Sequence, residues 1–234
     1  MSDEHQNKYR SDVGTILYLI KHSHPDLCNC IRELSKVMQI GTMGHYKQML
    51  RAKKFISDSR ILGLNFKPNQ NIQHDWKMNT YVDSDWGGDH DTRISVSGWT
   101  IFIAECLIGL GSRGQKSVTM SSSEAEYIAI SEVCKEIILA KKVLEFMIIV
   151  VNYPFLINVD NVSAIYLANN ADGKRTKHID IQYHFVREYV EQNIVKIIFV
   201  TTNDNIVDPY TKNVSEHTYV QHHSKYMLKF KEEK

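Results

Sequence analysis

The sequence predicts a mixed α/β protein, in which a mixed sheet carries helices on its faces and a smaller, mostly helical segment comes first. Two patterns predict it. Apolar residues recur at helical spacing in the first part of the chain, whereas the second part begins with β-rich runs and continues with strands that alternate with helices. Of the 234 residues, 43% are hydrophobic and 24% charged, which is typical of a globular protein long enough to bury a core.

The first part of the chain contains three helical patterns, at Val13–Lys21, Asp26–Met38 and Tyr46–Ser57. A short strand-like run follows at Leu62–Phe66. Lys67–Gln73 is polar and contains a proline, which is typical of a linker. We therefore expect a boundary at this segment.

Three units follow from that boundary: a helical segment with its linker at residues 1–73, an α/β domain at 74–213 and a C-terminal tail at 214–234. We expect the first unit to make few contacts with the second. A fragment that starts near His74 is expected to fold, because the later strands and helices supply a core of their own.

The second part opens with β-rich runs at Thr80–Val82, Trp99–Ala104 and Ser117–Met120, and then with a long helix. Ser121 and Glu124 have the spacing of a capping box at the start of that helix. Its expected apolar face consists of Ala125, Ile128, Ala129, Val133, Ile137, Ala140, Leu144 and Met147.

Strands and helices alternate in the remainder. Phe155–Val159 and Ile194–Val200 are predicted strands, and Val162–Ala168 and Lys177–Gln192 are predicted helices. A short helical segment is expected around Asp208.

Charge and cysteine content limit the classes of function. The formal net charge is +1, so any surface that binds nucleic acid must be local. The polar N-terminus lacks the apolar core of a signal peptide, and no apolar run reaches the length of a membrane span. We therefore expect an intracellular protein that makes no membrane contact and has free thiols at its four cysteines.

A zinc site at His22, His24, Cys28 and Cys30 is an alternative, because all four are residue types that zinc accepts. We favour a helix here instead. Two cysteines two positions apart on a helix point to different sides.

Four carboxylates stand where α/β folds place ligands. Asp83 and Asp160 each end a predicted strand, Glu126 lies in the first turns of the long helix, and Asp208 lies near the last helix. Such carboxylates repel one another unless cations neutralise them, and their hard oxygens suit Mg²⁺ or Mn²⁺. Two ions about 4 Å apart can hold the attacking and leaving oxygens of a phosphodiester. By spacing alone, we favour the interpretation that these aspartates and the glutamate are turn residues and helix caps.

Several motifs, in a fixed order, resemble the ribonuclease H domain of copia-type retrotransposon Pol polyproteins, and two upstream motifs resemble the reverse-transcriptase connection region. The upstream motifs are Val13–Leu19 and His24–Asp26. The ribonuclease H motifs are Tyr81–Asp89, Thr92–Trp99, Ser121–Ala129, Val159–Ile165, Arg175–Glu188 and Asp208–Lys212.

The resemblance implies a ribonuclease H-like five-stranded mixed sheet flanked by helices. It also implies a metal-dependent endonuclease that cuts the RNA strand of RNA–DNA hybrids during reverse transcription, in the cytoplasm (in a virus-like particle) or the nucleus. Asp83, Glu126, Asp160 and Asp208 match the family's catalytic carboxylates, which hold two Mg²⁺ or Mn²⁺ ions. The implied partners are the hybrid and the polymerase domain of the same polyprotein.

Two basic clusters are candidate phosphate contacts. The resemblance favours substrate binding by Lys174, Arg175, Lys177 and His178. For a second cluster, which begins at Arg51 and includes Lys53 and Lys54, we favour a solvated helix face.

Three positions depart from the family pattern. Leu110 stands where the family usually has Trp, Gly114 replaces a Lys, and Ile94 replaces a basic residue. We expect these changes to remove contacts near the substrate surface. They leave open an alternative function, a decayed or domesticated copy that folds and can bind nucleic acid without cleaving it.

Overall fold

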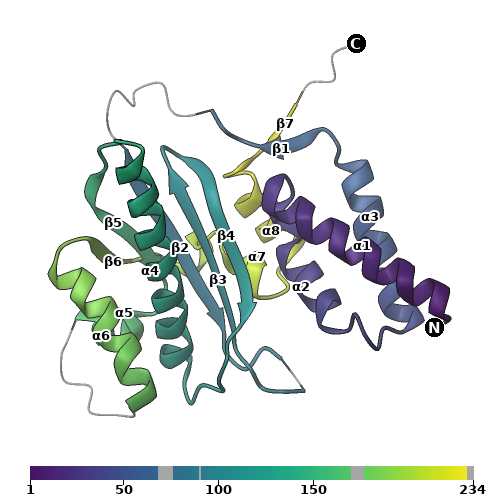
Figure 1. Ribbon diagram of the computed structural model, residues 1–234, viewed down its shortest axis with the longest axis horizontal. Helices are drawn as coiled ribbons and strands as arrows, with labels where there is room; N and C mark the ends of the chain where they lie inside the picture. Colours follow the sequence, from purple (N-terminus) through teal and green to yellow (C-terminus); the bar gives the residue numbers. More distant parts are fainter. Residues whose placement is uncertain (68–75, 90, 170–176, 231–234) are drawn as a thin grey trace.

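A five-stranded sheet forms the centre of the computed structural model, which describes residues 1–67, 76–89, 91–169 and 177–230, except for the side chains of 177–181 (Figure 1). Its strand order is β4-β3-β2-β5-β6. β2 runs antiparallel to β3 and parallel to β5. The expected mixed sheet is thus confirmed. Its strands are β2 Lys77–Asp85, β3 Val96–Ile103, β4 Cys106–Gly114, β5 Asn152–Val159 and β6 Val195–Phe199.

Three helices cover one face of this sheet (Figure 1): α4 Ser122–Phe146, α5 Val162–Asn169 and α6 Lys177–Glu191. The predicted long helix is therefore present. Ser121 caps it by accepting a hydrogen bond from the Glu124 N–H at 3.2 Å. The apolar face of α4 packs on the sheet and buries residues such as Val133 and Ile137 completely.

The N-terminal helices lie against the opposite face, near β3 and β4 (Figure 1). They are α1 Asp3–His22, η1 Pro25–Leu27, α2 Cys28–Lys36 and α3 Met43–Asp58. The three predicted helices are therefore present, with shifted ends. None of the helices in the described part of the chain is long and apolar enough to cross a membrane.

The N-terminal helices share one hydrophobic core with the rest of the protein. Buried residues of α1 and α2 join Phe102 of β3, Leu107 of β4 and Tyr210 near the C-terminus in a single cluster. The expectation of few contacts between the first unit and the α/β domain is therefore wrong. Apolar spacing shows that a helix face is buried, but not against which partner.

The C-terminal segment after residue 213 also folds onto the N-terminal part. It contains α8 Glu216–His223 and β7 Met227–Lys229. β7 pairs antiparallel with β1 Leu62–Leu64, so that Leu62 lies opposite Lys229 (Figure 1). The division at residues 73 and 213 remains a prediction about folding units.

One predicted strand is wrong. Ser117–Met120 is not a strand, and the edge strand is instead the preceding segment, Cys106–Gly114. Three glycines in that segment lower its β propensity, which explains why it was missed. The Thr119 side chain bonds to Ser95 and its carbonyl accepts from Trp86, so side-chain bonds hold the 117–120 segment in place of a ladder.

Gly98 of β3 lets the last part of the chain approach the sheet beside Asp83, its partner across the strand pair. A Cβ at this position would lie 2.5 Å from Cγ2 of Thr211 and 2.9 Å from Cγ1 of Val207. We expect Gly98→Ala to displace the segment that carries these side chains and to destabilise the protein by roughly 1–3 kcal/mol. Urea unfolding measures the change.

Gly114→Ala in the neighbouring strand is the matched control, because its nearest atom would lie at 3.7 Å, an ordinary contact. Equal stability losses for the two variants would contradict the close approach at Gly98.

Candidate metal centre

Two parallel strands bring Asp83 and Asp160 to the same edge of the sheet. Asp83 lies near the end of β2, and Asp160 directly follows β5. Tyr81 of β2 lies opposite Asn158 of β5, so the residues two positions further along each strand are also neighbours. The register therefore explains why aspartates 77 residues apart in sequence meet.

Glu126 completes a group of three carboxylates. It lies in the second turn of α4, and its Oε1 accepts a hydrogen bond from the Ser84 N–H at 3.0 Å. One oxygen each of Asp83, Glu126 and Asp160 lies within 4.8 Å of the others. Among the described residues, this is the one group of three or more His, Cys, Asp or Glu side chains with such spacing. Asp83 is 2% exposed and Glu126 5%.

Asp208, the fourth predicted carboxylate, is linked to this group by Lys212, which contacts both Asp208 and Asp83. It begins the short helix α7 Asp208–Thr211. The Lys212 Nζ lies 3.2 Å from Oδ1 of Asp208 and 3.6 Å from Oδ2 of Asp83. The Thr211 hydroxyl donates a hydrogen bond to Asp83. Sequence reasoning missed Lys212 and Thr211 as site residues, although both belong to the motif that Asp208 opens.

Amide side chains fix the elements around the carboxylates. The Asn205 side chain donates to the Val82 carbonyl at 2.7 Å and ties the segment before α7 to β2. Gln115, which is buried, donates to the Ala125 carbonyl at 2.8 Å and to the Ser97 hydroxyl at 3.0 Å. The first bond holds the start of α4 next to Glu126, and the second ties Gln115 to β3.

The N-terminal helix α2 supports α7 from outside the sheet. The Arg32 guanidinium donates to the Thr211 carbonyl at 3.4 Å, and the Asn29 amide donates to the Asn213 side chain at 3.3 Å. Because α7 carries Asp208, the N-terminal segment contributes to the geometry of the site.

Burial, reinforced by repulsion among the carboxylates, disfavours negative charge at this site. Burial raises the pKa of Asp83 to about 6, although Lys212 opposes the rise. Burial, reinforced by Asp83 and Asp160, raises the pKa of Glu126 well above its usual value. Burial also raises the pKa of Asp208. Cations that neutralise these groups are therefore favoured.

The donor set fits a hard divalent cation. All of its candidate ligand atoms are carboxylate oxygens, which Mg²⁺ and Mn²⁺ prefer. Oε2 of Glu126 is buried and has no hydrogen-bond partner in the part of the chain that the structure describes. A buried, unpartnered carboxylate oxygen costs free energy, and coordination to a cation would recover it.

The chain is similar in sequence to retrotransposon polyproteins. It is 32% identical, over 209 residues and 89% of its length, to the retrovirus-related Pol polyprotein from transposon RE2 of Arabidopsis thaliana. The chain is homologous to one segment of the copia-type Pol polyproteins. It is also 30% identical, over 212 residues and 90% of its length, to the Pol polyprotein from transposon TNT 1-94 of Nicotiana tabacum.

This Pol segment spans 14% of the RE2 polyprotein and 16% of the TNT 1-94 polyprotein. No protein-family model matches it. Among solved structures, it is similar to LC11-RNase H1 in complex with an RNA/DNA hybrid, at 10% identity and a TM-score of 0.43, over 58% of this chain and 94% of that one.

The predicted contacts of Lys174, Arg175, Lys177 and His178 with the substrate remain a prediction. Lys174 and Arg175 lie outside the described residues, and Lys177 and His178 open α6 with side chains that are not described.

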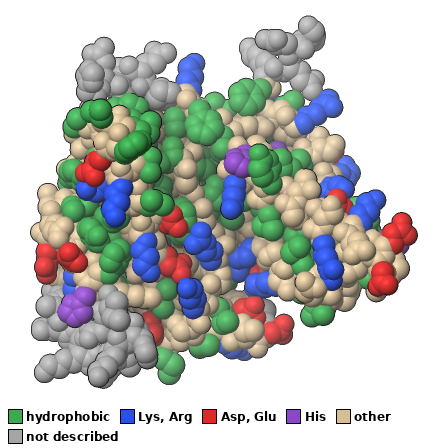
Figure 2. Space-filling model, in the orientation of Figure 1, with side chains coloured by type: hydrophobic (Ala, Val, Ile, Leu, Met, Phe, Trp, Pro, Cys, Tyr) green, Lys and Arg blue, Asp and Glu red, His purple; other side chains and the backbone are tan. Residues whose placement is uncertain are grey.

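The surroundings of the second basic cluster are those of a helix face in solvent, as predicted. Lys53 pairs with Asp12 at 2.8 Å, and the exposed Lys54 pairs with Asp58 at 2.6 Å. In the view of Figure 2, basic and acidic side chains are interspersed over the surface.

The four cysteines of the Pol segment are free, as expected. Cys28 is buried and Cys30 is exposed, so the two thiols point to different sides of α2 and do not converge on a zinc ion.

The three departures from the family pattern have different surroundings. Leu110 packs partly buried against the core that the N-terminal helices share with the sheet. It therefore fills a packing position, and the loss of a substrate contact through this change stays a prediction. Ile94 is half-buried and Gly114 is exposed at the end of β4.

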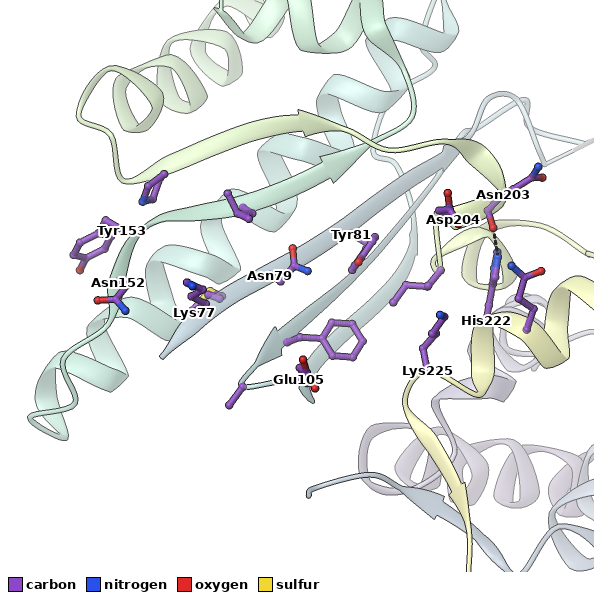
Figure 3. Close-up of a pocket in the computed structure, with 17 residues that line it drawn as sticks. Lys77, Asn79, Tyr81, Glu105, Asn152, Tyr153, Asn203, Asp204, His222 and Lys225 are labelled. Atoms are coloured by element: carbon purple, nitrogen blue, oxygen red, sulfur yellow. Dashed lines mark hydrogen bonds between the residues drawn. The ribbon is translucent and has the colours of Figure 1, made fainter. Parts of the chain in front are cut away.

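A pocket of about 940 Å³ also lies on the sheet (Figure 3). Its lining includes Asn79 and Tyr81 of β2 and His222, whose Nε2 donates to the Asn203 carbonyl at 3.0 Å. None of the four predicted carboxylates lines it. The candidate ligands therefore lie outside the lining of this pocket.

The metal-free Pol segment is expected to lose stability as pH rises from about 4 to about 6. In this window the folded protein holds a proton on Asp83 that the unfolded chain releases, because the pKa is about 6 in the fold and 3.8 ordinarily. The difference corresponds to roughly 3 kcal/mol.

Urea unfolding in EDTA between these pH values measures the slope, and Asp83→Asn is expected to reduce it. Millimolar Mg²⁺ is expected to raise the melting temperature at pH 7, because the ion binds the folded state. Stability that rises with pH in this window, with the same slope in the variant, would contradict a strained Asp83.

Proposed function

We propose that this chain is a metal-dependent endonuclease that cuts the RNA strand of RNA–DNA hybrids during retrotransposon reverse transcription. The observation that carries the proposal is the buried group of Asp83, Glu126 and Asp160, with Asp208 beside it. Homology to the Pol polyproteins supports a role in reverse transcription. The motifs around the four carboxylates support the hybrid as substrate.

The four carboxylates are the proposed ligands of two Mg²⁺ or Mn²⁺ ions. Bound there, the ions would activate a water for attack on a phosphodiester and stabilise the leaving oxygen. The chain's own groups hold the ligands in place: the Ser84 N–H bonds to Glu126, and the Thr211 hydroxyl bonds to Asp83. Such fixed ligands limit reorganisation when the substrate arrives.

Further contacts with the hybrid are proposed for Lys174, Arg175, Lys177 and His178, whose charges suit phosphates. Preference for RNA would come from groove shape and 2′-hydroxyl contacts. Because the chain spans about one seventh of its relatives, we also propose that the polymerase domain of the polyprotein contributes to the grip on the hybrid. Residues 74–213 are the proposed nuclease unit and residues 1–73 the proposed connection region.

Cleavage of an end-labelled RNA–DNA hybrid by the purified chain tests the proposal. We expect cuts in the RNA strand with Mg²⁺ or Mn²⁺, and none with EDTA. The DNA strand and single-stranded RNA of the same sequence are the control substrates. Equal cleavage of single-stranded RNA, or cleavage that survives EDTA, would contradict the proposal.

The second candidate is a decayed copy that folds without cutting. The departures from the family pattern at Leu110, Gly114 and Ile94 favour it. A chain that binds the hybrid and is stabilised by Mn²⁺, yet leaves the RNA intact, would establish this candidate in place of the nuclease.

A further inference from the structure

We propose that Lys212 is a built-in cation that closes the metal centre of the metal-free protein, and that a divalent ion must displace its ammonium group to bind. The inference rests on the proposed metal site and assigns a competitor to it. In the metal-free protein, the charge of Lys212 would hold Asp83 and Asp208 close together until a divalent ion binds.

The position of the ammonium group is the first argument. Nζ lies between two candidate ligands from different elements, Asp83 of β2 and Asp208 of α7, at 3.6 and 3.2 Å. The two carboxylate side chains are 3% and 8% exposed, so water screens them little. Lys212 therefore supplies positive charge where the proposed ligands need it.

The looseness of these contacts is the second argument. Tight charge-assisted hydrogen bonds have N···O distances of about 2.7–2.9 Å. Lys36 makes such contacts, at 2.8 Å to both Glu33 and Asp89. Lys212 approaches neither of its partners that closely. Its ammonium group neutralises two carboxylates at once without a tight hydrogen bond to either, so an incoming ion has little to break when it displaces the group.

The freedom of the side chain is the third argument. The backbone of Lys212 is held, because its N–H bonds to the Asp208 carbonyl at 3.2 Å. Its side chain is 36% exposed and borders a cleft of about 1420 Å³ that Asp89 and Asn213 also line. Four rotatable methylenes allow the ammonium to leave the carboxylates while α7 stays in place.

Competition follows from these contacts. An ion coordinated by Asp83 would lie next to the carboxylate that Lys212 now neutralises, and an ammonium beside a divalent cation is repelled. Because the two cations share ligands, each lowers the occupancy of the other.

The first test is Mg²⁺ and Mn²⁺ binding by calorimetry to the wild-type chain and to Lys212→Met. We expect the variant to bind each ion about tenfold more tightly or better. Lys36→Met is the matched control, because it removes the same charge from an ion pair outside the carboxylate group, and it is expected to bind as the wild type does.

The second test needs no variant. Lysines of the wild-type chain are acetylated with a limiting amount of reagent, and mass spectrometry compares each site with and without Mg²⁺. We expect Mg²⁺ to increase modification of Lys212 severalfold and to leave Lys36 unchanged. This measurement decides the matter even where Lys212→Met does not fold.

The outcomes separate this inference from the proposed function. Binding of equal strength to the wild type and Lys212→Met, with Lys212 no more reactive in Mg²⁺, overturns the inference and leaves the metal site standing. No binding to either protein overturns the metal site and the inference with it. Binding to the variant alone supports the inference.

Discussion

Asp83→Asn is expected to abolish RNA cleavage. Asp83 is the one carboxylate that contacts Thr211 and Lys212 and also belongs to the group with Glu126 and Asp160. The amide keeps the size of the side chain but removes an anionic oxygen from the proposed ligands. Loss of several kcal/mol of transition-state stabilisation corresponds to a rate that falls roughly a thousandfold or more.

The variant is nevertheless expected to fold. Burial raises the pKa of Asp83, which means that the fold disfavours its charge, and a neutral amide avoids that penalty. Metal-free Asp83→Asn should therefore be at least as stable as the wild type near pH 7, as urea unfolding would show. A folded but inactive variant separates a chemical role from a structural one.

Asp85→Asn is the matched control, since it makes the same substitution two residues further along β2. Asp85 lies outside the group of three carboxylates, so the Asp85→Asn variant is expected to lose much less activity than Asp83→Asn. Cleavage by Asp83→Asn at near the wild-type rate, or an equal loss in both variants, would contradict the ligand assignment.

Removal of residues 1–67 is expected to have the largest effect on stability. The N-terminal helices cover Phe102, Leu107, Tyr210 and Tyr226, all of which are less than 10% exposed. Each large apolar side chain contributes roughly 1.5–3 kcal/mol when fully buried, so partial exposure of this set costs several kcal/mol. The total stability of a domain is only about 5–15 kcal/mol.

The truncation also removes the support of the metal centre. Arg32 and Asn29 hold α7 and the residue after Lys212, and β1 pairs with β7. We expect a fragment of residues 76–230 to melt at a strongly lowered temperature, or to show no cooperative unfolding transition, when circular dichroism is followed on heating. This expectation revises the independent folding that the sequence suggested for a fragment from His74.

A pair of point variants checks the same interface without a truncation. Ile16→Ala removes a side chain of α1 that is 2% exposed, and Leu17→Ala removes its neighbour, which is 37% exposed. The first is expected to cost about 2–5 kcal/mol and the second much less. A fragment 76–230 as stable as the whole chain would show that the shared core contributes little.

The grouping of Asp83, Glu126 and Asp160 could be predicted from the sequence because its signals are local. Asp83 and Asp160 follow β-rich runs, and parallel strands bring such positions together. Glu126 follows a helix start that Ser121 marks, and the capping bond is present. Each of these signals needs only a few neighbouring residues to be read.

The missed features depend on contacts between distant segments. Lys212 reaches Asp83 only because α7 docks over Gly98, a contact that joins positions more than a hundred residues apart. The strands β1 and β7 have three residues each and stabilise one another across most of the chain. Local pattern carries little information about such pairs. The strand β4 was missed for a different, local reason, because its glycines lower its β propensity.

The most direct test of the metal centre is anomalous diffraction from a crystal of this chain grown with millimolar Mn²⁺. We expect anomalous density between the carboxylates of Asp83, Glu126 and Asp160, with distances of about 2.0–2.3 Å to their oxygens. Well-defined side chains at these positions, with no anomalous density among them and Lys212 still between Asp83 and Asp208, would contradict the assignment.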